Sequence, residues 1–192
     1  MIPQAVRRTH LWPLLLALLF VPAQATTVEP QTLGDLIMAA DRIQRVRVLK
    51  AQVEPGVHLG HPAVLTHYAF EVQETFYGDA SPHLSTYGGE FNKIRYVLHG
   101  QPTLEVGREY LLFLHDRPTQ SPFCGISAGV FELSEAGIQQ GGRTLLDWDR
   151  LGRCSYVQDN ETPASVELFL ADLRLGVSLR GDLESLLEGG EQ

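Results

Sequence analysis

Residues 64–76 read Val-Leu-Thr-His-Tyr-Ala-Phe-Glu-Val-Gln-Glu-Thr-Phe, the clearest alternating stretch in the chain. Its even positions carry most of the large apolar and aromatic side chains, and its odd positions carry most of the polar ones. A period of two is typical of a β-strand that turns one face to the core and the other to water. The stretch therefore predicts a long, half-buried strand.

The segment before this strand predicts another strand with a sharp bend. Residues 43–53 also alternate, but the apolar parity changes after Val48. A β-bulge produces such a change of parity and bends the strand. Pro55 and Gly56 then predict a loop that ends near Pro62.

Later segments predict shorter strands. The almost wholly apolar run 110–114 is typical of a strand buried on both faces, so we expect it in the centre of the sheet. Further strands are predicted at residues 84–87, 94–98, 103–106, 125–133 and 138–140. The rest of the chain to about Asn160 is predicted to be loop.

Short helices are predicted at the periphery. Thr32 is a favourable N-cap for a helix with one apolar face, formed by Leu33, Leu36, Ile37 and Ala40. Thr162-Pro163 opens a second helix, whose apolar stripe consists of Val166, Phe169, Leu170 and Leu173. This helix is expected to stop before Gly176, and a third is predicted at residues 182–188.

These elements predict a mainly β protein. Short antiparallel strands, a bulged first strand and peripheral helices favour a small OB-like β-barrel, closed or nearly closed. A β-sandwich of immunoglobulin type is the alternative. The barrel would occupy residues 26–160, and residues 161–192 would form a helical segment that packs on the barrel or trails it.

The N-terminus predicts an export signal that is removed. Arg7 and Arg8 precede an apolar run at residues 11–21, and Ala23-Gln24-Ala25 provides the small residues that a signal peptidase reads. Residues 1–25 would be cleaved off, so the mature protein would begin at Thr26. We expect it to be periplasmic or secreted, without stable membrane insertion after cleavage.

The charge balance bears on the kind of partner. The 192 residues contain 15 Lys and Arg against 23 Asp and Glu, a formal net charge of -8. Nucleic acid and anionic membranes attract proteins with a surplus of basic residues, so neither is an expected partner. Hydrolase, phosphate-loop and dinucleotide-binding motifs are absent from the sequence, which disfavours an enzyme.

The two cysteines, Cys124 and Cys154, predict a disulfide, because an even pair in an exported chain is most simply oxidised. The alternative is a reactive thiol at Cys124. No neighbouring residue in the sequence argues for an activated thiolate there.

Several stretches carry a resemblance to known proteins. They are Ala40-Asp41-Arg42-Ile43, Tyr68 to Val72, Phe76-Tyr77-Gly78, Gly88-Gly89 and Val106 to Leu114. The chain resembles a group of uncharacterised bacterial exported proteins over residues 38–133. More distantly, it resembles the netrin-like module of tissue inhibitors of metalloproteinases, an OB-type barrel.

The resemblance implies a fold, and only the fold is transferred. Those inhibitors reach the protease zinc through an N-terminal cysteine and carry several disulfides. Cleavage here would leave Thr26-Thr27 at the N-terminus and a single pair of cysteines. The inhibitory mechanism is therefore not carried over.

Two groups of residues could carry chemistry. His58, His61 and His67 could converge on Zn or Cu, although isolated histidines are more often polar loop residues. Asp147 and Asp149 flank Trp148, an arrangement that could supply the acid, base and sugar platform of a secreted hydrolase. A solvated turn is the simpler interpretation of these two acids.

The outward face of the long strand is the predicted binding face, and its residues are Leu65, His67, Glu71 and Gln73. The alternative is that the helix opening at Thr162 covers this face, in which case the turns at residues 101–108 become the binding candidate. The favoured function is recognition of a protein or peptide partner by a non-enzymatic domain, of which a protease inhibitor is a special case. A hydrolase or a metal-binding protein is the alternative.

Overall fold

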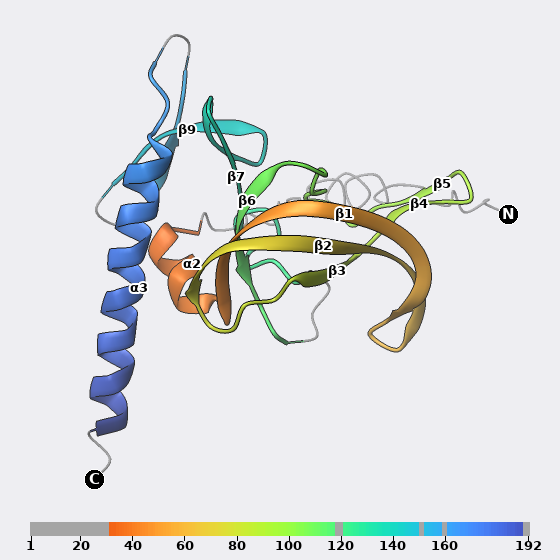
Figure 1. Ribbon diagram of the computed structural model, residues 1–192, viewed down its shortest axis with the longest axis horizontal. Coiled ribbons are helices and arrows are strands. Elements are labelled where there is room, and N and C mark those ends of the chain that lie inside the picture. The colour runs from red at the N-terminus through yellow and green to blue at the C-terminus, as the bar shows by residue number, and fades with distance from the viewer. Residues whose placement is uncertain (1–30, 118–120, 150–151, 159–160, 190–192) are drawn as a thin grey trace, which may run out of the picture.

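The computed structural model describes residues 31–117, 121–149, 152–158 and 161–189 (Figure 1). The predicted export signal and its cleavage site lie outside these residues. Within them, the protein is mainly β, as predicted, with two helices beside a large antiparallel sheet.

The described elements are two helices and ten strands. The helices are α2 (Leu33–Ala39) and α3 (Val166–Gly189). The strands are β1 (Arg42–His58), β2 (His61–Tyr77), β3 (His83–Tyr87), β4 (Gly89–Phe91), β5 (Ile94–Tyr96), β6 (Glu109–Leu114), β7 (Val130–Ser134), β8 (Gly137–Gln140), β9 (Arg143–Trp148) and β10 (Cys154–Tyr156). Eight strands form one sheet in the order β10-β9-β8-β7-β6-β1-β2-β3, and β4 and β5 form a separate hairpin.

Strands β1 and β2 form a long curved arm (Figure 1). A register shift between Val48 and Lys50 confirms the predicted bulge. The predicted loop from Pro55 to Pro62 is wrong, because pairing continues to His58 and His61 around a two-residue tip. Pro55 is tolerated because β6 pairs with β1 only as far as Arg47, so the missing N–H of this proline interrupts no second ladder.

Strand β6 is central and is buried on both faces, as predicted. Leu111 and Phe113 point into a core that α2 and α3 cover. Tyr110 and Leu112 point into a second core on the concave side of the sheet, together with Tyr68 of β2. The sheet is thus curled, and β3 and β10 are its edges in the described part of the chain.

Several predicted boundaries are corrected by the structure. Residues 103–106 are not a strand, but Leu104 is buried in the concave core. The predicted loop after residue 140 contains β9 and β10, which extend the sheet.

The helices keep their predicted apolar faces. Thr32 and Asp35 form a capping box at the start of α2, which fixes where that helix begins. Phe169, Leu170 and Leu173 of α3 are buried in the core that α2 also contacts. The two helices predicted after residue 161 are one continuous helix instead. Gly176 has a packing role inside this helix, since a Cβ there would lie 2.8 Å from Ile37 Cδ1, so glycine allows α2 to approach α3 closely.

Candidate functional site

The predicted binding face is only partly available. Leu65 is buried, and His67 Nδ1 lies 2.7 Å from the Ser85 hydroxyl, so both contribute to packing within the sheet. Glu71 and Gln73 are exposed. Helix α3 does not cover Leu65, because its apolar stripe packs against the core around α2 and Phe131.

Polar side chains on and beside the exposed part of this face already bond to one another, with Glu109 at the centre. Glu109 accepts hydrogen bonds from Arg45 at 2.7 Å, from Arg47 at 2.5 Å and from Gln73 at 2.9 Å. Burial acts to raise the pKa of Glu109, but these three donors outweigh it and lower the pKa from 4.5 to about 2. The carboxylate therefore holds β1, β2 and β6 together and has little capacity left for a ligand.

This network predicts a pH dependence of stability. A carboxyl group whose pKa is depressed by folding stabilises the native state above the unfolded pKa, and that stability is lost as the pH falls through the folded pKa. We therefore expect Glu109→Gln to be less stable than wild type at pH 7, with the difference shrinking between about pH 4.5 and pH 2. Urea midpoints measured across this range test it, with Glu90→Gln on the exposed β4 as the control. Parallel curves for wild type and Glu109→Gln would contradict the assignment.

The three predicted metal ligands are not brought together. His58 and His61 face each other across the tip of the β1–β2 arm, whereas His67 lies on β2 opposite Gln52. In the described ranges, no group of three or more His, Cys, Asp or Glu side chains is arranged to hold a metal ion. The three-histidine site is therefore not formed, because the histidines fall along an extended hairpin where a compact loop was expected.

The predicted acid pair has other partners. Asp149 accepts hydrogen bonds from the backbone N–H and the side chain of Arg153, at 3.0 and 2.7 Å. Asp147 accepts a bond from the backbone N–H of Trp148. The Trp148 ring packs edge-on against Phe169, and its Nε1 donates to Asp172. The indole is thus part of the helix–sheet contact, and this arrangement offers no sugar platform between two acids.

The predicted disulfide is corrected as well. Cys124 and Cys154 are free thiols that do not lie within disulfide distance. Cys124 is fixed beside β6 by its N–H bond to the Phe113 carbonyl, while Cys154 begins the edge strand β10, opposite Trp148. Separate backbone ladders therefore hold the two sulfurs apart.

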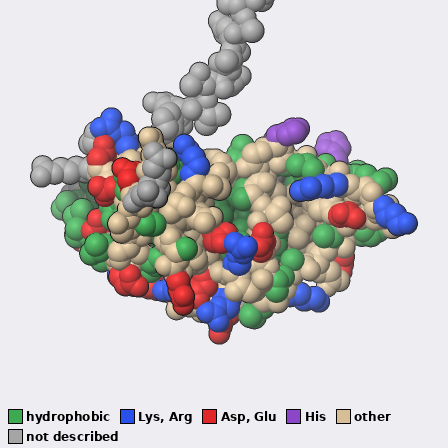
Figure 2. Space-filling view, turned by 90° about the horizontal axis from the view of Figure 1, so that it is seen from above, with side chains coloured by type: hydrophobic (Ala, Val, Ile, Leu, Met, Phe, Trp, Pro, Cys, Tyr) green, Lys and Arg blue, Asp and Glu red, His purple; other side chains and the backbone are tan. Residues whose placement is uncertain are grey.

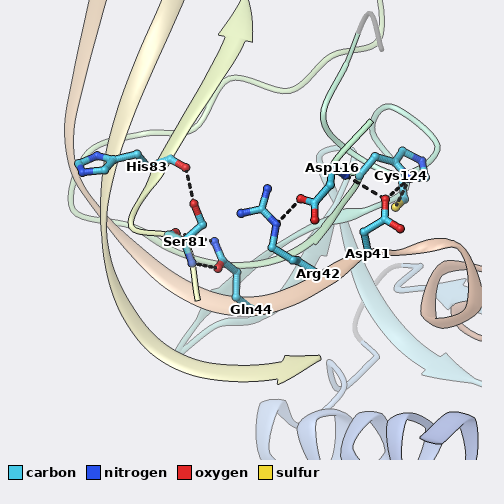
Figure 3. Close-up of polar contacts among 8 residues, drawn as sticks. Asp41, Arg42, Gln44, Ser81, His83, Asp116 and Cys124 are labelled. Atoms are coloured by element: carbon cyan, nitrogen blue, oxygen red, sulfur yellow. Dashed lines mark hydrogen bonds and ion pairs between the residues drawn. The ribbon is translucent and has the colours of Figure 1, made fainter. Parts of the chain in front are cut away.

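Cys124 is also unsuited to act as a nucleophile, although it lies beside Asp41 (Figure 3) and close to His115. Its sulfur is 3.7 Å from His115 Nδ1, and the Asp41 carboxylate lies 3.8 Å from the same nitrogen. A catalytic triad needs the acid and the nucleophile on opposite ring nitrogens. Burial, together with the charge of Asp41, raises the pKa of the Cys124 thiol to about 12. The thiol therefore stays protonated.

The remaining polar contacts in Figure 3 are structural. The Gln44 side chain, which is fully buried, both donates to and accepts from the Ser81 backbone at 3.1 Å. Arg42 forms an ion pair with Asp116 at 2.6 Å. These contacts tie the start of β1 to two loops.

A cleft around Tyr87 has the properties of a binding site. It consists of two adjoining hollows, of about 240 and 390 Å³, which share Tyr87, Val97 and Leu98. The first hollow lies between Tyr68 of β2 and the loop at residues 101–104. The second lies beneath the tip of the β1–β2 arm. We call these two hollows together the Tyr87 cleft.

The rim of the Tyr87 cleft is apolar and exposed. Val97 and Leu59 line it directly and are about half exposed, and Val57 and Ile94 are exposed on the adjacent arm and hairpin. Clustered exposed apolar side chains are typical of interaction sites, in contrast to apolar residues scattered singly.

Two residues that line the cleft each carry a buried polar atom that has no partner among the described residues. Gln101 Nε2 donates to the Tyr87 carbonyl at 2.7 Å, which leaves Gln101 Oε1 as an unpaired acceptor. His58, whose ring lies 5.8 Å from that of Tyr87, has an unpaired Nε2. Buried polar groups are nearly always hydrogen-bonded in native proteins, so such a pair beside one cleft indicates a place where a ligand or water bonds.

A larger hollow, of about 550 Å³, lies beside Glu109 and is less suited to a ligand. Its lining is dominated by charged side chains that already pair with one another, such as Arg45 with Glu109 and Arg108 with Glu132. Figure 2 shows acidic and basic side chains intermixed on one face of the molecule, without an extended basic surface there.

Sequence reasoning missed the Tyr87 cleft, apart from the alternative that placed binding at residues 101–108. The signals were the apolar Val57 and Leu59 on either side of His58, and Tyr87 before two glycines. No protein-family model matches this chain, and no curated protein matches it in sequence. Neither helix, within the residues described, combines the length and hydrophobicity that crossing a membrane requires.

Proposed function

We propose that this chain is an exported, non-enzymatic domain that binds an extended segment of a protein or peptide partner in the Tyr87 cleft. The observation that carries the proposal is the combination of an exposed apolar rim with two lining residues, His58 and Gln101, that each hold an unpaired buried polar atom next to the concavity. Ligand sites typically combine an apolar lining with a few polar groups that fix orientation.

The position of β3 at the edge of the described sheet favours an extended ligand. Strand β3 ends the described sheet, and Tyr87 is its last residue. An exposed strand edge accepts a further strand through backbone hydrogen bonds, while adjacent pockets take alternate side chains. A peptide along β3 would place an apolar side chain over Tyr87 and Val97, and its N–H groups near Gln101.

Export is part of the proposal and rests on the N-terminal sequence. The basic pair, the apolar run and Ala23-Gln24-Ala25 support cleavage before Thr26, and a partner in the periplasm or outside the cell. The resemblance to exported proteins and to the netrin-like module is consistent with a binding domain. It supplies no inhibitory residue.

A displayed library of random peptides tests the proposal. Peptides selected on the wild-type chain are expected to bind Val97→Glu at least about tenfold more weakly, because the substitution buries a charge against the apolar ligand. Leu49→Glu is the matched control, since Leu49 is as exposed as Val97 but lies outside the lining of the cleft.

The outcomes separate clearly. Loss of binding in Val97→Glu with retention in Leu49→Glu supports the Tyr87 cleft. Failure to enrich any peptide, or equal binding to both variants, overturns the proposal. Unfolding midpoints of the two variants should match, because both substitutions are on the surface.

A further inference from the structure

Aromatic and polar side chains line the first hollow of the Tyr87 cleft, which lies between Tyr68 and the loop at residues 101–104. Its volume is about 240 Å³, below the roughly 300–1,000 Å³ of sites that hold a whole small molecule. Tyr68, Tyr87 and Tyr96 are among its lining residues. The hollow therefore has the size for one large side chain, and an aromatic ring that enters it has aromatic neighbours.

The polar groups on the sheet side of this hollow already have partners. The Thr66 hydroxyl donates to the Gly88 carbonyl at 2.7 Å, and the Tyr68 hydroxyl accepts from the Leu104 N–H at 3.3 Å. Both Thr66 and Tyr68 are buried. These hydroxyls form a polar wall, but they do not depend on a ligand for a hydrogen bond.

Gln101, on the loop side, differs because its amide is fixed with one end unsatisfied. Its Nε2 donates to the Tyr87 carbonyl at 2.7 Å, whereas Oε1 is buried and has no partner among the described residues. Turning the amide over would set Oε1 against that carbonyl, so that two acceptors would face each other. The bond to Tyr87 thus determines which end is free. Only an N–H or O–H donor can complete the hydrogen bonding of Oε1.

A neutral donor suits this hollow better than a charged one. The charged residues that line it, Glu90 and Arg95, are opposite each other on the β4–β5 hairpin, and both are exposed. One acid and one base give the lining no net charge. A lysine or arginine that entered the hollow would lose its hydration without a buried counter-charge, which is costly.

We propose that the Tyr87 cleft selects a peptide segment with a tyrosine or a tryptophan, whose ring enters the first hollow and whose O–H or N–H donates to Gln101 Oε1. The inference rests on the proposed function, because it names the side chain that the bound segment presents. Oε1 is covered in the free protein, so binding includes a small shift of the loop at residues 101–104 that opens this atom to the hollow.

The donor is what makes the site selective. Tyrosine and tryptophan combine an apolar ring with a polar tip, and phenylalanine has the ring without the tip. A site that bonds to a donor rejects the analogue that lacks it, because the acceptor then stays buried and unpaired. Gln101 is therefore the specificity-determining residue of the cleft.

Peptides that the wild-type chain selects from the displayed random library test the inference. We expect tyrosine or tryptophan at one position of the enriched peptides. Replacing that tyrosine by phenylalanine, or that tryptophan by benzothienylalanine, removes the donor and keeps the shape of the ring. Either change should weaken binding to the wild-type chain by at least about tenfold, measured by fluorescence anisotropy of labelled synthetic peptides. This comparison needs no protein variant, so it does not depend on how a variant folds.

Gln101→Leu tests the identity of the acceptor. We expect this variant to bind the peptide with the donor and the peptide without it about equally. Thr103→Val is the matched control, since Thr103 lines the same hollow and loses a polar group of its own. The control should keep the wild-type preference for the donor. Thermal unfolding of both variants checks that they fold.

The outcomes distinguish this inference from the proposed function. Peptides that are enriched and that bind Val97→Glu weakly, but that bind equally well without the donor, would overturn the inference and leave the proposed function standing. A preference for the donor that persists in Gln101→Leu would also overturn it. Failure to enrich any peptide would overturn both.

Discussion

Replacing Phe131 by alanine is expected to lower the free energy of unfolding by about 3–5 kcal/mol. Phe131 is fully buried on β7, and its ring lies 5.8 Å from that of Phe113 and 5.3 Å from that of Phe169. It thus joins the central strand β6 to helix α3. Alanine would leave a cavity between sheet and helix that neither side can close without disturbing its own hydrogen bonds.

Urea denaturation followed by circular dichroism measures this loss. For a chain of this size, the expected drop in the thermal midpoint is on the order of 10 °C. Phe131→Leu should lose less, because most of the volume remains. Ile94→Ala is the surface control, since Ile94 is 57% exposed, and it should change stability by less than about 0.5 kcal/mol. A Phe131→Ala variant within 1 kcal/mol of wild type would show that the helix–sheet core is not formed as described.

The sequence predicted the parts of the fold that local patterns determine. Thr32 and Asp35 specify the start of α2 through bonds between near neighbours. The parity change after Val48 marks a bulge that the register confirms. The apolar run in β6 requires burial on both faces, wherever its neighbours lie.

Features that depend on distant partners were not predictable in this way. Pro55 and Gly56 suggest a turn, but the free edge of the arm tolerates them and the chain turns at Leu59 and Gly60 instead. Gly176 suggests a helix end, yet α3 continues through it, and the glycine instead makes room for Ile37 of α2.

In the candidate site, too, local features could be predicted and features that depend on distant residues could not. The alternation of residues 64–76 correctly predicted that Glu71 and Gln73 are exposed. It could not show that Gln73 donates a hydrogen bond to Glu109, which follows 36 residues later on another strand. The Tyr87 cleft needs β2, β3 and the loop after β5 to meet, and no spacing in the sequence encodes that meeting. An unpaired atom such as Gln101 Oε1 is visible only once its neighbours are placed.

At Gly78 the backbone passes so close to the carbonyl of Asp41 that we expect no side chain to be tolerated there. Gly78 follows β2 with φ of +69°, and a Cβ there would lie 2.4 Å from the carbonyl oxygen of Asp41. That carbonyl cannot retreat easily, because the Asp41 N–H donates to Leu114 at 2.9 Å and its carboxylate accepts from the Asp116 N–H at 2.9 Å. The start of β1 is therefore fixed against the end of β2.

Gly78→Ala should accordingly cost at least about 3 kcal/mol, the sum of left-handed backbone strain and the steric clash. Gly60→Ala separates the two causes, because Gly60 has φ of +81° at the tip of the same arm but nothing within 4 Å of the added Cβ. Strain alone predicts a cost of about 1–2 kcal/mol there. Urea unfolding of both variants measures the difference. Equal losses in the free energy of unfolding would show that Gly78 does not lie close to the Asp41 carbonyl. A larger loss in Gly78→Ala would show that the close contact between Gly78 and the Asp41 carbonyl adds a steric cost to backbone strain at the base of the arm that forms one wall of the Tyr87 cleft.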